Sequence, residues 1–348
     1  MTKDELFDVT IIGGGPAGLF SAFYSGLREM KTKIIEYQPQ LGGKVHVYPE
    51  KMIWDIGGMP PVSGAKYIEQ AVEQGLTFNP EVVLNERVAS ITRNEEEIYE
   101  LHADSGVHYS KTVIVAVGSG ILNPKKLTIS GSERFEDSNL HYSVKSLESF
   151  KGKTVMISGG GSSATDWANE LESIADRVFI SCRKNNFDCH ESLATRLKNS
   201  SVVCFFHTAI TDLVADDDGK TIKEVELSNH ETGAVNYLPV DDVIVNHGYE
   251  RETTLLENSD SDIEIAENYF VSGNPNSVSS MDGLYAAGDI LMHEGKLNLI
   301  AGAFQDAANA VNQAKQFVQP DAEKAAMVSS HNDVLKEHNE ALKKQMVE

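Results

Sequence analysis

One segment near the start of the chain limits the possible folds more than any other feature. Residues 9–18 read VTIIGGGPAG, which is an apolar strand followed by a glycine turn and the first residues of a helix. In such a turn Gly13 allows the sharp exit from the strand, Gly15 lets the backbone approach a pyrophosphate, and Gly18 lets the helix pack closely on the sheet. The pattern predicts a dinucleotide-binding βαβ unit at the start of an α/β domain.

The residues after the turn supply the remaining parts of this unit. Pro16 and Ala17 begin the helix, whose first backbone N–H groups and positive dipole end face the expected pyrophosphate. The next apolar run ends at Glu36, where a carboxylate accepts hydrogen bonds from ribose hydroxyls. We therefore expect a nucleotide with a free 2′-hydroxyl here. A glycine-rich turn that binds nothing is the alternative.

A second copy of this pattern lies near the middle of the chain, at residues 155–164. Its sequence, VMISGGGSSA, again joins a strand to a helix, with alanine at the third glycine position. The doubled pattern predicts two nucleotide-binding modules. The residues that we expect to bind the second nucleotide are Gly159, Gly161, Ser162, Ser163 and Ala164.

The two modules differ at the end of their second strand. Where the first has Glu36, the second has Cys182 followed by Arg183 and Lys184. Two cations make charge-assisted contacts to a ribose 2′-phosphate, whereas a carboxylate repels it. The second module is therefore predicted to bind NADP(H) rather than NAD(H). A solvated basic pair at a strand end is the alternative interpretation.

Length and composition limit the remaining possibilities. The 348 residues suffice for two domains with separate cores, and a hydrophobic content of 41% is typical of globular proteins. A net charge of −22 argues against binding to nucleic acids or anionic membranes. No apolar run is long enough to span a bilayer, and the start is polar, so we expect a cytoplasmic protein. The three cysteines have neither CxxC nor metal-ligand spacing, so we expect no redox disulfide and no metal.

Several motifs resemble those of the flavoprotein pyridine nucleotide reductases. They are IIGGGPAGLFSAFY, YQPQLGGK, VYPEKMIWDIGGMP, LHYSV, GGGSSATDWA, YAAGDI and EGKLNLIAGAF, and they extend over nearly the whole chain. The match is strongest to the ferredoxin–NADP reductases of the thioredoxin-reductase-like type found in Gram-positive bacteria. The resemblance implies an α/β fold with two nested Rossmann-like, three-layer dinucleotide-binding domains.

The order of the elements, together with this resemblance, indicates that one domain is inserted into the other. After the second module the sequence returns to a strand at residues 283–289 and to a long helix from about Leu297 to Gln316. We therefore predict a discontinuous FAD-binding domain, residues 1–117 and 249–348, that surrounds an NAD(P)H-binding domain, residues 118–248.

The resemblance also assigns roles to individual residues of the first module. Glu36 would bind the adenosine ribose of FAD, Tyr48 would stack on the isoalloxazine ring, and Asp289 would hydrogen-bond the ribityl chain. Val88 and Leu122 would touch adenine and flavin, respectively. The residues that we expect to bind FAD are Gly13, Gly15, Pro16, Ala17, Gly18, Glu36, Lys44, Tyr48, Val88, Leu122, Asp289, Ser329 and Ser330.

Two residues differ from the family pattern, and one C-terminal segment falls where the family has an extension. Lys44 stands beside the expected flavin where the family typically has glutamine. Asp188 stands where the family has a further phosphate-binding arginine, so the preference for NADPH is expected to be weaker, and NADH is a second candidate coenzyme. Residues 329–331, SSH, fall in the C-terminal extension that covers a flavin face across a dimer in the family. A homodimer is therefore expected, with a disordered tail as the alternative.

In the family, the cofactors carry the chemistry. Hydride passes between NADPH and flavin N5, and single electrons pass between the flavin and a ferredoxin or flavodoxin-like carrier, so we assign no catalytic side chain. The helix that begins near Leu297 would direct its positive N-terminus at the flavin edge where negative charge accumulates. Residues 139–145, where thioredoxin reductases carry a CxxC, contain no sulfur, which excludes dithiol chemistry there.

Three hypotheses about function follow. The leading one is a FAD-dependent ferredoxin–NADP reductase. The alternative is an NAD(P)H oxidase or diaphorase that reduces oxygen, quinones or iron chelates, and the net charge of −22 supports it because ferredoxins are themselves acidic. The third is a non-catalytic sensor that binds FAD and NAD(P)H and signals through a partner. The intact glycines of both modules argue against a sensor.

Overall fold

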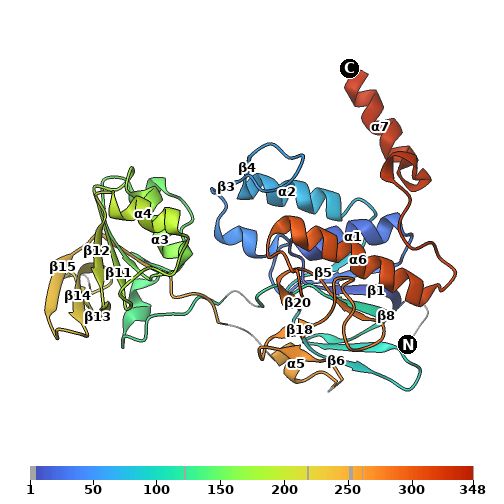
Figure 1. Ribbon diagram of the computed structural model, residues 1–348, viewed down its shortest axis with the longest axis horizontal. Helices are drawn as coiled ribbons and strands as arrows, with labels where there is room; N and C mark the ends of the chain where they lie inside the picture. The colour runs from blue at the N-terminus through green and yellow to red at the C-terminus, as the bar shows by residue number, and fades with distance from the viewer. Residues whose placement is uncertain (1–4, 121–122, 218, 251–253, 261, 348) are drawn as a thin grey trace. The chain divides into compact units, whose positions relative to one another are not determined.

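The chain forms two compact units. The computed structural model describes residues 5–120, 123–217, 219–250, 254–260 and 262–347. One unit consists of Met1–Ile121 and Arg251–Glu348, and the other consists of Leu122–Glu250. The second unit is therefore an insertion between two segments of the first, and each unit has its own sheets and helices (Figure 1).

A seven-stranded sheet forms the centre of the first unit. Its strands are β1 (Leu6–Ile12), β2 (Thr32–Ile35), β5 (Glu81–Val83), β6 (Val88–Arg93), β7 (Tyr99–Ala103), β8 (Gly106–Val115) and β19 (Leu284–Ala286). The order is β5-β2-β1-β8-β7-β6, and β19 pairs with β8. β5, β2, β1, β8 and β19 are parallel, whereas β7 pairs in antiparallel fashion with β8 on one side and with β6 on the other. The carboxyl ends of the parallel strands therefore meet at one edge.

Two hydrophobic cores lie on opposite faces of this sheet. The helices of the unit are α1 (Pro16–Leu27), α2 (Gly64–Gly75), α5 (Thr254–Glu257), α6 (Ile300–Val318) and α7 (Lys336–Val347). Ile114 of β8 joins the core beneath α1 and α6, whereas its neighbour Val115 joins the other core, as strand alternation requires. Among the described residues, no helix has both the length and the apolar character needed to cross a bilayer.

Shorter strands complete the first unit. They are β3 (Met52–Ile53), β4 (Val62–Ser63), β17 (Ile265–Ala266), β18 (Phe270–Ser272) and β20 (Leu291–Met292). β3 and β4 pair with each other, and the connection between them carries Trp54, which is 73% exposed. The side chains of Ile53 and Val62 pack towards α2 in a small separate core.

The second unit contains a five-stranded parallel sheet and a three-stranded antiparallel sheet. The parallel order is β12-β11-β10-β16-β9. Trp167 is buried against one face with Ile157 and Ile180, and Met156 packs on the other face against the antiparallel sheet. The elements are β9 (Leu140–His141), β10 (Thr154–Ser158), α3 (Ser162–Leu171), β11 (Arg177–Cys182), α4 (Glu191–Lys198), β12 (Val203–Phe206), β13 (Thr208–Ala215), β14 (Ile222–Asn229), β15 (Val235–Pro239) and β16 (Asp242–Val245).

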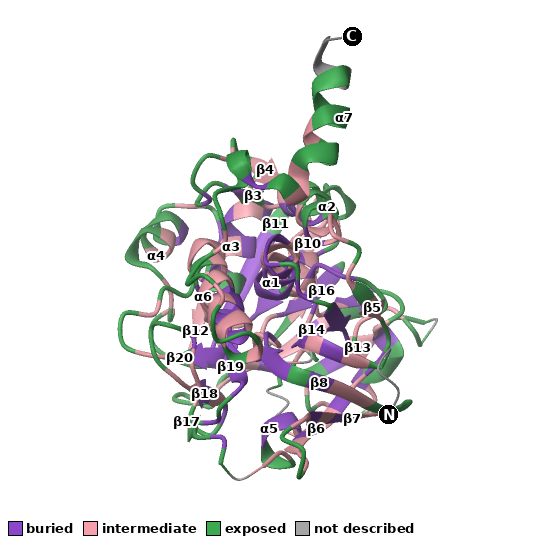
Figure 2. Ribbon diagram, turned by 90° about the vertical axis from the view of Figure 1, so that its right-hand side faces the viewer, coloured by how far each residue is buried: buried purple, intermediate pink, exposed green. Residues whose placement is uncertain are grey.

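An extension, residues 319–347, follows α6 and is held against the C-terminal end of α1. Arg28 donates a hydrogen bond to the carbonyl of Glu323 at 2.5 Å, and Asn332 donates to the carbonyl of Leu27 at 3.4 Å. Burial lowers the pKa of the Arg28 guanidinium. After these contacts α7 is mostly exposed (Figure 2).

The helix predicted to begin near Leu297 begins at Ile300 instead. Leu299 has extended backbone, and its N–H donates to the carbonyl of Leu297 at 2.9 Å, which closes a tight turn before the helix. A Cβ on Gly302 would overlap that same carbonyl. The positive end of α6 is therefore set by a close backbone contact, and it lies at residues 299–300.

Candidate functional site

The first glycine turn joins the end of β1 to α1 at the carboxyl edge of the sheet. Gly13 has a φ of 106°, and a Cβ there would lie 2.5 Å from the carbonyl oxygen of Ala116. A Cβ on Gly18 would overlap the carbonyl oxygen of Gly13. Gly15 is the N-cap and Pro16 the first helical residue, and no side chain caps the helix. The first N–H groups of α1 are therefore available to an anionic ligand.

The carboxylate of Glu36 is directed at this turn from the end of β2. Its Oε2 accepts the N–H of Gly14 at 2.6 Å, and its Oε1 accepts the N–H of Gln38 at 2.7 Å. A carboxylate oxygen accepts more than one hydrogen bond, so each oxygen can still accept a ribose hydroxyl. The arrangement fits the predicted nucleotide.

The loop at Gly42 and Gly43, part of the YQPQLGGK motif, completes a backbone cradle beside the first turn. The N–H of Gly42 donates to the carbonyl of Gly14 at 2.8 Å. A Cβ on Gly43 would lie 2.7 Å from the Cα of Gly15. The signal was present in LGGK, because paired glycines after a strand indicate close backbone approach.

The segments that carry Tyr48, Asp289 and the first residue of α6 all contact α1 or the turn before it. Burial raises the pKa of the Tyr48 hydroxyl, and the negative charge of Asp289 raises it further. Tyr48 also packs against a small core that Ile300 joins. A Cβ on Gly288, beside Asp289, would lie 2.9 Å from the Cβ of Ala17 at the start of α1. These predicted flavin contacts thus surround one region beside the first turn.

The other predicted FAD residues contribute less to this region. Val88 is buried in the core with Ile12 and Ile35. Lys44 is exposed in the 3₁₀ helix that follows the Gly42–Gly43 loop. Leu122 lies outside the described residues.

The second glycine turn repeats this construction between β10 and α3. Gly159 has a φ of 153°, and a Cβ there would lie 2.5 Å from the carbonyl oxygen of Asn246 and 3.0 Å from the Cβ of Ala164. A Cβ on Gly161, by contrast, would meet no atom within 4 Å. The two serines that follow are exposed, and no side chain caps α3. Open space therefore lies above the start of α3, where a pyrophosphate would bind.

Cys182 occupies the position in the second unit that Glu36 occupies in the first. A Cβ on Gly160 would overlap its sulfur, and the thiol donates to the carbonyl of Asn186 at 3.5 Å. The turn therefore has a thiol beside it instead of a carboxylate. All three cysteines of the chain are free.

The basic pair beyond Cys182 is partly neutralised by Asp188. The Nζ of Lys184 lies 3.1 Å from the carboxylate of Asp188, and both side chains are exposed. The N–H of Asp188 donates to the carbonyl of Gly160 at 2.7 Å, which fixes this anion beside the turn. Arg183, the other member of the basic pair, is exposed.

Ser329 and Ser330 lie at the opposite end of α1 from the first glycine turn. Their 3₁₀ helix comes immediately before Asn332, which contacts Leu27 at the last turn of α1. Helix α1 has 12 residues, and a helix of that length rises about 18 Å. Within one chain, the structure does not bring these two serines to the turn.

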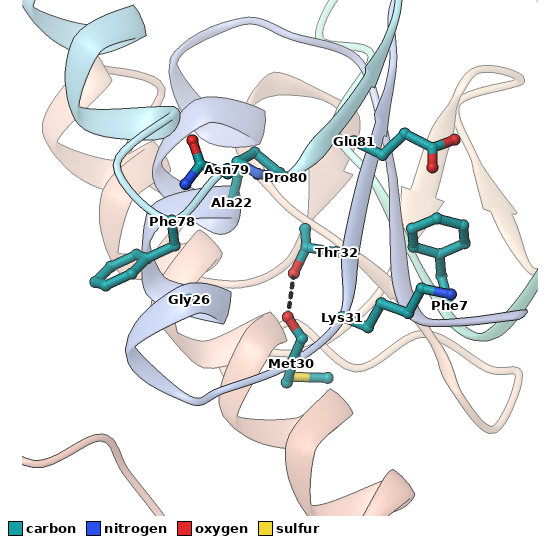
Figure 3. Close-up of a pocket in the computed structure, with 10 residues that line it drawn as sticks. All are labelled: Phe7, Ala22, Gly26, Met30, Lys31, Thr32, Phe78, Asn79, Pro80 and Glu81. Carbon is teal, nitrogen blue, oxygen red and sulfur yellow. Dashed lines mark hydrogen bonds between the residues drawn. The ribbon is translucent and has the colours of Figure 1, made fainter. Parts of the chain in front are cut away.

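A cavity of about 300 Å³ lies elsewhere in the first unit (Figure 3). Phe7, Phe78 and Glu81 are among the residues that line it, and none of its lining residues is a predicted site residue. The candidate sites are therefore backbone turns rather than this cavity. In the described parts of the chain, no three His, Cys, Asp or Glu side chains are grouped to hold a metal ion.

Comparison with known sequences gives matches over nearly the whole chain. Residues 7–314 match the family described as pyridine nucleotide-disulphide oxidoreductase. The chain is 67% identical to ferredoxin–NADP reductase 1 of Bacillus mycoides, with 100% of both chains covered. It is 60% identical to ferredoxin–NADP reductase 2 of Exiguobacterium sibiricum, over 100% of this chain and 99% of that protein.

Comparison with solved structures gives the fold. Thioredoxin reductase of T. acidophilum superposes with a TM-score of 0.76 at 22% identity, over 90% of this chain and 98% of that one. Thioredoxin reductase of Lactococcus lactis gives a TM-score of 0.75 at 23% identity, over 90% and 99%. The predicted thioredoxin-reductase-like α/β fold with two Rossmann-like sheets is confirmed.

The open space above Gly161 generates a test of the second site. Gly161→Val is expected to fold normally because its side chain meets no protein atom, but to weaken NADPH binding at least tenfold because it fills the pyrophosphate space. Titration of the protein with NADPH and thermal unfolding measure the two effects. Gly159→Ala is the matched control. Its Cβ would overlap the carbonyl of Asn246, so this variant should lower the unfolding temperature in addition to weakening NADPH binding. Unchanged NADPH affinity in Gly161→Val would place the nucleotide elsewhere.

Proposed function

The chain belongs to the pyridine nucleotide-disulphide oxidoreductase family, and we propose that it is a FAD-dependent ferredoxin–NADP reductase without a redox-active disulfide. The observation that carries the proposal is the full-length identity of 67% to a ferredoxin–NADP reductase. The two glycine turns support it, because one has a carboxylate beside it and the other has a basic pair.

The first unit is proposed to hold FAD, and its residues fit that group. The cradle at Gly13, Gly15 and Gly43 consists of backbone positions where a Cβ would be obstructed or would approach the opposing loop. When bound, FAD supplies the redox chemistry that side chains lack, accepting two electrons as hydride and releasing them singly. The chain's part is to bind and orient. Glu36 holds the ribose, and the first N–H groups of α1 hold the pyrophosphate.

Residues near Tyr48 are proposed to orient the reactive ring. Tyr48 would stack on the ring, Asp289 would hydrogen-bond the ribityl chain, and the start of α6 at Ile300 would direct its positive end at the ring. The positive end of α6 stabilises negative charge on that edge without any proton transfer. No side chain acts as a general acid or base in this proposal.

The second unit is proposed to hold NADPH. The pyrophosphate occupies the open space above Gly161, and Arg183 and Lys184 bind the 2′-phosphate. The carboxylate of Asp188 pairs with Lys184 and reduces the positive charge available to that phosphate. NADPH is therefore preferred only moderately over NADH.

An NAD(P)H oxidase or diaphorase is the second candidate function. Its support is the net charge of −22, because a strongly acidic protein repels an acidic ferredoxin except at a local basic site. A non-catalytic sensor of nucleotide state is the third candidate. The full-length identity of 67% to a ferredoxin–NADP reductase supports an enzyme over a sensor.

Anaerobic reduction by NADPH distinguishes the three candidates. We expect NADPH to bleach the yellow absorbance of the purified protein, and the reduced protein to transfer electrons to an added ferredoxin or flavodoxin at a catalytic rate. Ferricyanide and oxygen serve as comparison acceptors. Rapid turnover with these alone would favour the oxidase or diaphorase, and no bleaching by NADPH would favour the sensor.

The C-terminal extension is proposed to cover a flavin in a second copy of the chain. Support comes from its anchoring at Arg28 and Leu27, at the end of α1 remote from the first glycine turn. Ser329 and Ser330 then belong to the FAD site of the partner in a homodimer. Their hydroxyls would hydrogen-bond polar edges of the ring, and the extension would exclude water from it.

Removal of the extension tests this arrangement. A chain that ends before Ser329 should show stronger flavin fluorescence and faster reaction with oxygen, because one face of the ring becomes accessible. A chain that ends after Leu335 lacks α7 but keeps both serines, and it should behave as the full-length protein does. If both truncated chains match the full-length protein in flavin fluorescence and carrier reduction, the extension is no lid.

The pair formed by Lys184 and Asp188 gives a test of coenzyme choice. Asp188→Asn should raise kcat/KM for NADPH about fivefold at low salt and leave that for NADH unchanged, since it frees Lys184 and removes a repulsive charge. The gain should diminish at high ionic strength. Glu148→Gln is the matched control, because it removes the partner of Lys151 in a similarly exposed pair of the same unit. Equal gains for both coenzymes would contradict this role.

A further inference from the structure

A buried ion pair lies beside the Gly288–Asp289 turn and has no part in the function proposed above. The side chains of Lys296 and Asp306 are only 8% and 7% exposed. The Nζ of Lys296 contacts one carboxylate oxygen of Asp306, and that same oxygen accepts the backbone N–H of Gly288 at 3.1 Å. The pair therefore connects helix α6, the segment before it, and the turn that carries Asp289.

Further contacts fix Asp306 from other directions. The Nε2 of His293 lies 3.7 Å from the second carboxylate oxygen of Asp306, in a side chain that is 8% exposed. The hydroxyl of Ser277 donates to the backbone carbonyl of Asp306 at 2.9 Å. The carboxylate thus faces two basic side chains and one backbone N–H, with little room to change its position.

Stability of the helix alone does not account for this pair. Burial of two charges carries a large desolvation cost, and apolar residues of similar volume often stabilise a core equally well or better. The neighbouring inward positions of α6 are occupied by alanines such as Ala303, Ala307 and Ala310, as expected for close helix packing. An alanine at position 306 could not accept the N–H of Gly288.

The turn that Asp306 holds is tightly confined. Gly288 has a φ of 77°, and a Cβ on it would lie 2.9 Å from Ala17 and 3.9 Å from Ala303. It is therefore wedged between the starts of α1 and α6. The next residue, Asp289, is close enough to Tyr48 to raise the pKa of its hydroxyl, second to the effect of burial. Any movement of the turn would move Asp289 relative to both Tyr48 and the glycine turn.

We propose that Asp306, held by Lys296, is the positioning residue for the Gly288–Asp289 turn and thereby sets the affinity of the first unit for FAD. This inference rests on the flavin function proposed above. Asp306 acts through the turn and does not itself touch the cofactor. The carboxylate is required because it neutralises the buried ammonium of Lys296 while it accepts the backbone N–H of Gly288.

The test measures the dissociation constant of FAD by the fluorescence that appears when the holoprotein is diluted. Asp306→Asn keeps the shape and removes the charge, and Lys296→Met removes the ammonium. Each should weaken FAD binding at least tenfold. Asp306→Glu keeps the carboxylate and should remain within about threefold of the unmodified protein. If residue 306 merely filled space, Asp306→Asn would bind FAD at least as tightly as Asp306→Glu.

Lys33 provides the matched control. Its side chain is 8% exposed and lies 2.9 Å from the carboxylate of Glu81, at the amino ends of the strands and away from the turn. Lys33→Met should lower the unfolding temperature and leave the FAD dissociation constant within twofold. The inference is overturned if Asp306→Asn and Lys296→Met bind FAD normally, or if Lys33→Met weakens FAD binding as much as they do. If the unmodified protein binds no FAD, the proposed flavin function fails first, and the inference fails with it.

Discussion

The close contact between the end of a strand and the start of a helix is the constraint on which both candidate sites depend. In the first unit the carbonyl of Gly13 occupies the space where a Cβ of residue 18 would lie, and in the second unit Gly159 leaves just enough room for Ala164. Each turn is built from backbone atoms, so its shape follows from sheet and helix packing rather than from side-chain rotamers. The side chain at the end of the next strand, Glu36 or Cys182, then sets the character of each site.

The sequence predicts the parts of this structure that have a local steric cause. The glycine spacing predicts both turns because Gly13 and Gly159 need a positive φ and Gly18 packs against the carbonyl of Gly13, all within a strand–turn–helix segment. Asp306 illustrates the limit. It shares its spacing with Ala303 and Ala310, so periodicity predicts an inward position. Periodicity cannot reveal that the residue it meets is Gly288, because that contact depends on how two separate segments fold together.

The C-terminal extension shows the same limit more strongly. Asn332 and Leu27 are 305 residues apart in the sequence, and no pattern in either segment predicts their hydrogen bond. The start of α6 was misplaced for a related reason, since helix propensity continues through residues 297–299 while the contact with Gly302 forces a turn there. At residues 297–299, tertiary packing therefore outweighs the local helix preference.

Burial gives similar ion pairs different consequences in this protein. Lys184 and Asp188 are exposed, so water and salt screen their attraction and leave the pair adjustable. Lys296 and Asp306 are buried, so loss of either partner leaves an uncompensated charge. The first arrangement suits a surface that selects between two coenzymes, and the second suits a fixed support.

The two tryptophans of the chain are divided between the units, and only the one in the second unit is buried. Trp54 is exposed in the first unit, whereas Trp167 is buried in the second, on the helix that begins at the second glycine turn. Emission from Trp54 is therefore expected at longer wavelength than emission from Trp167, so a red shift of the shorter-wavelength component reports the unfolding of the second unit in the intact chain without any added dye.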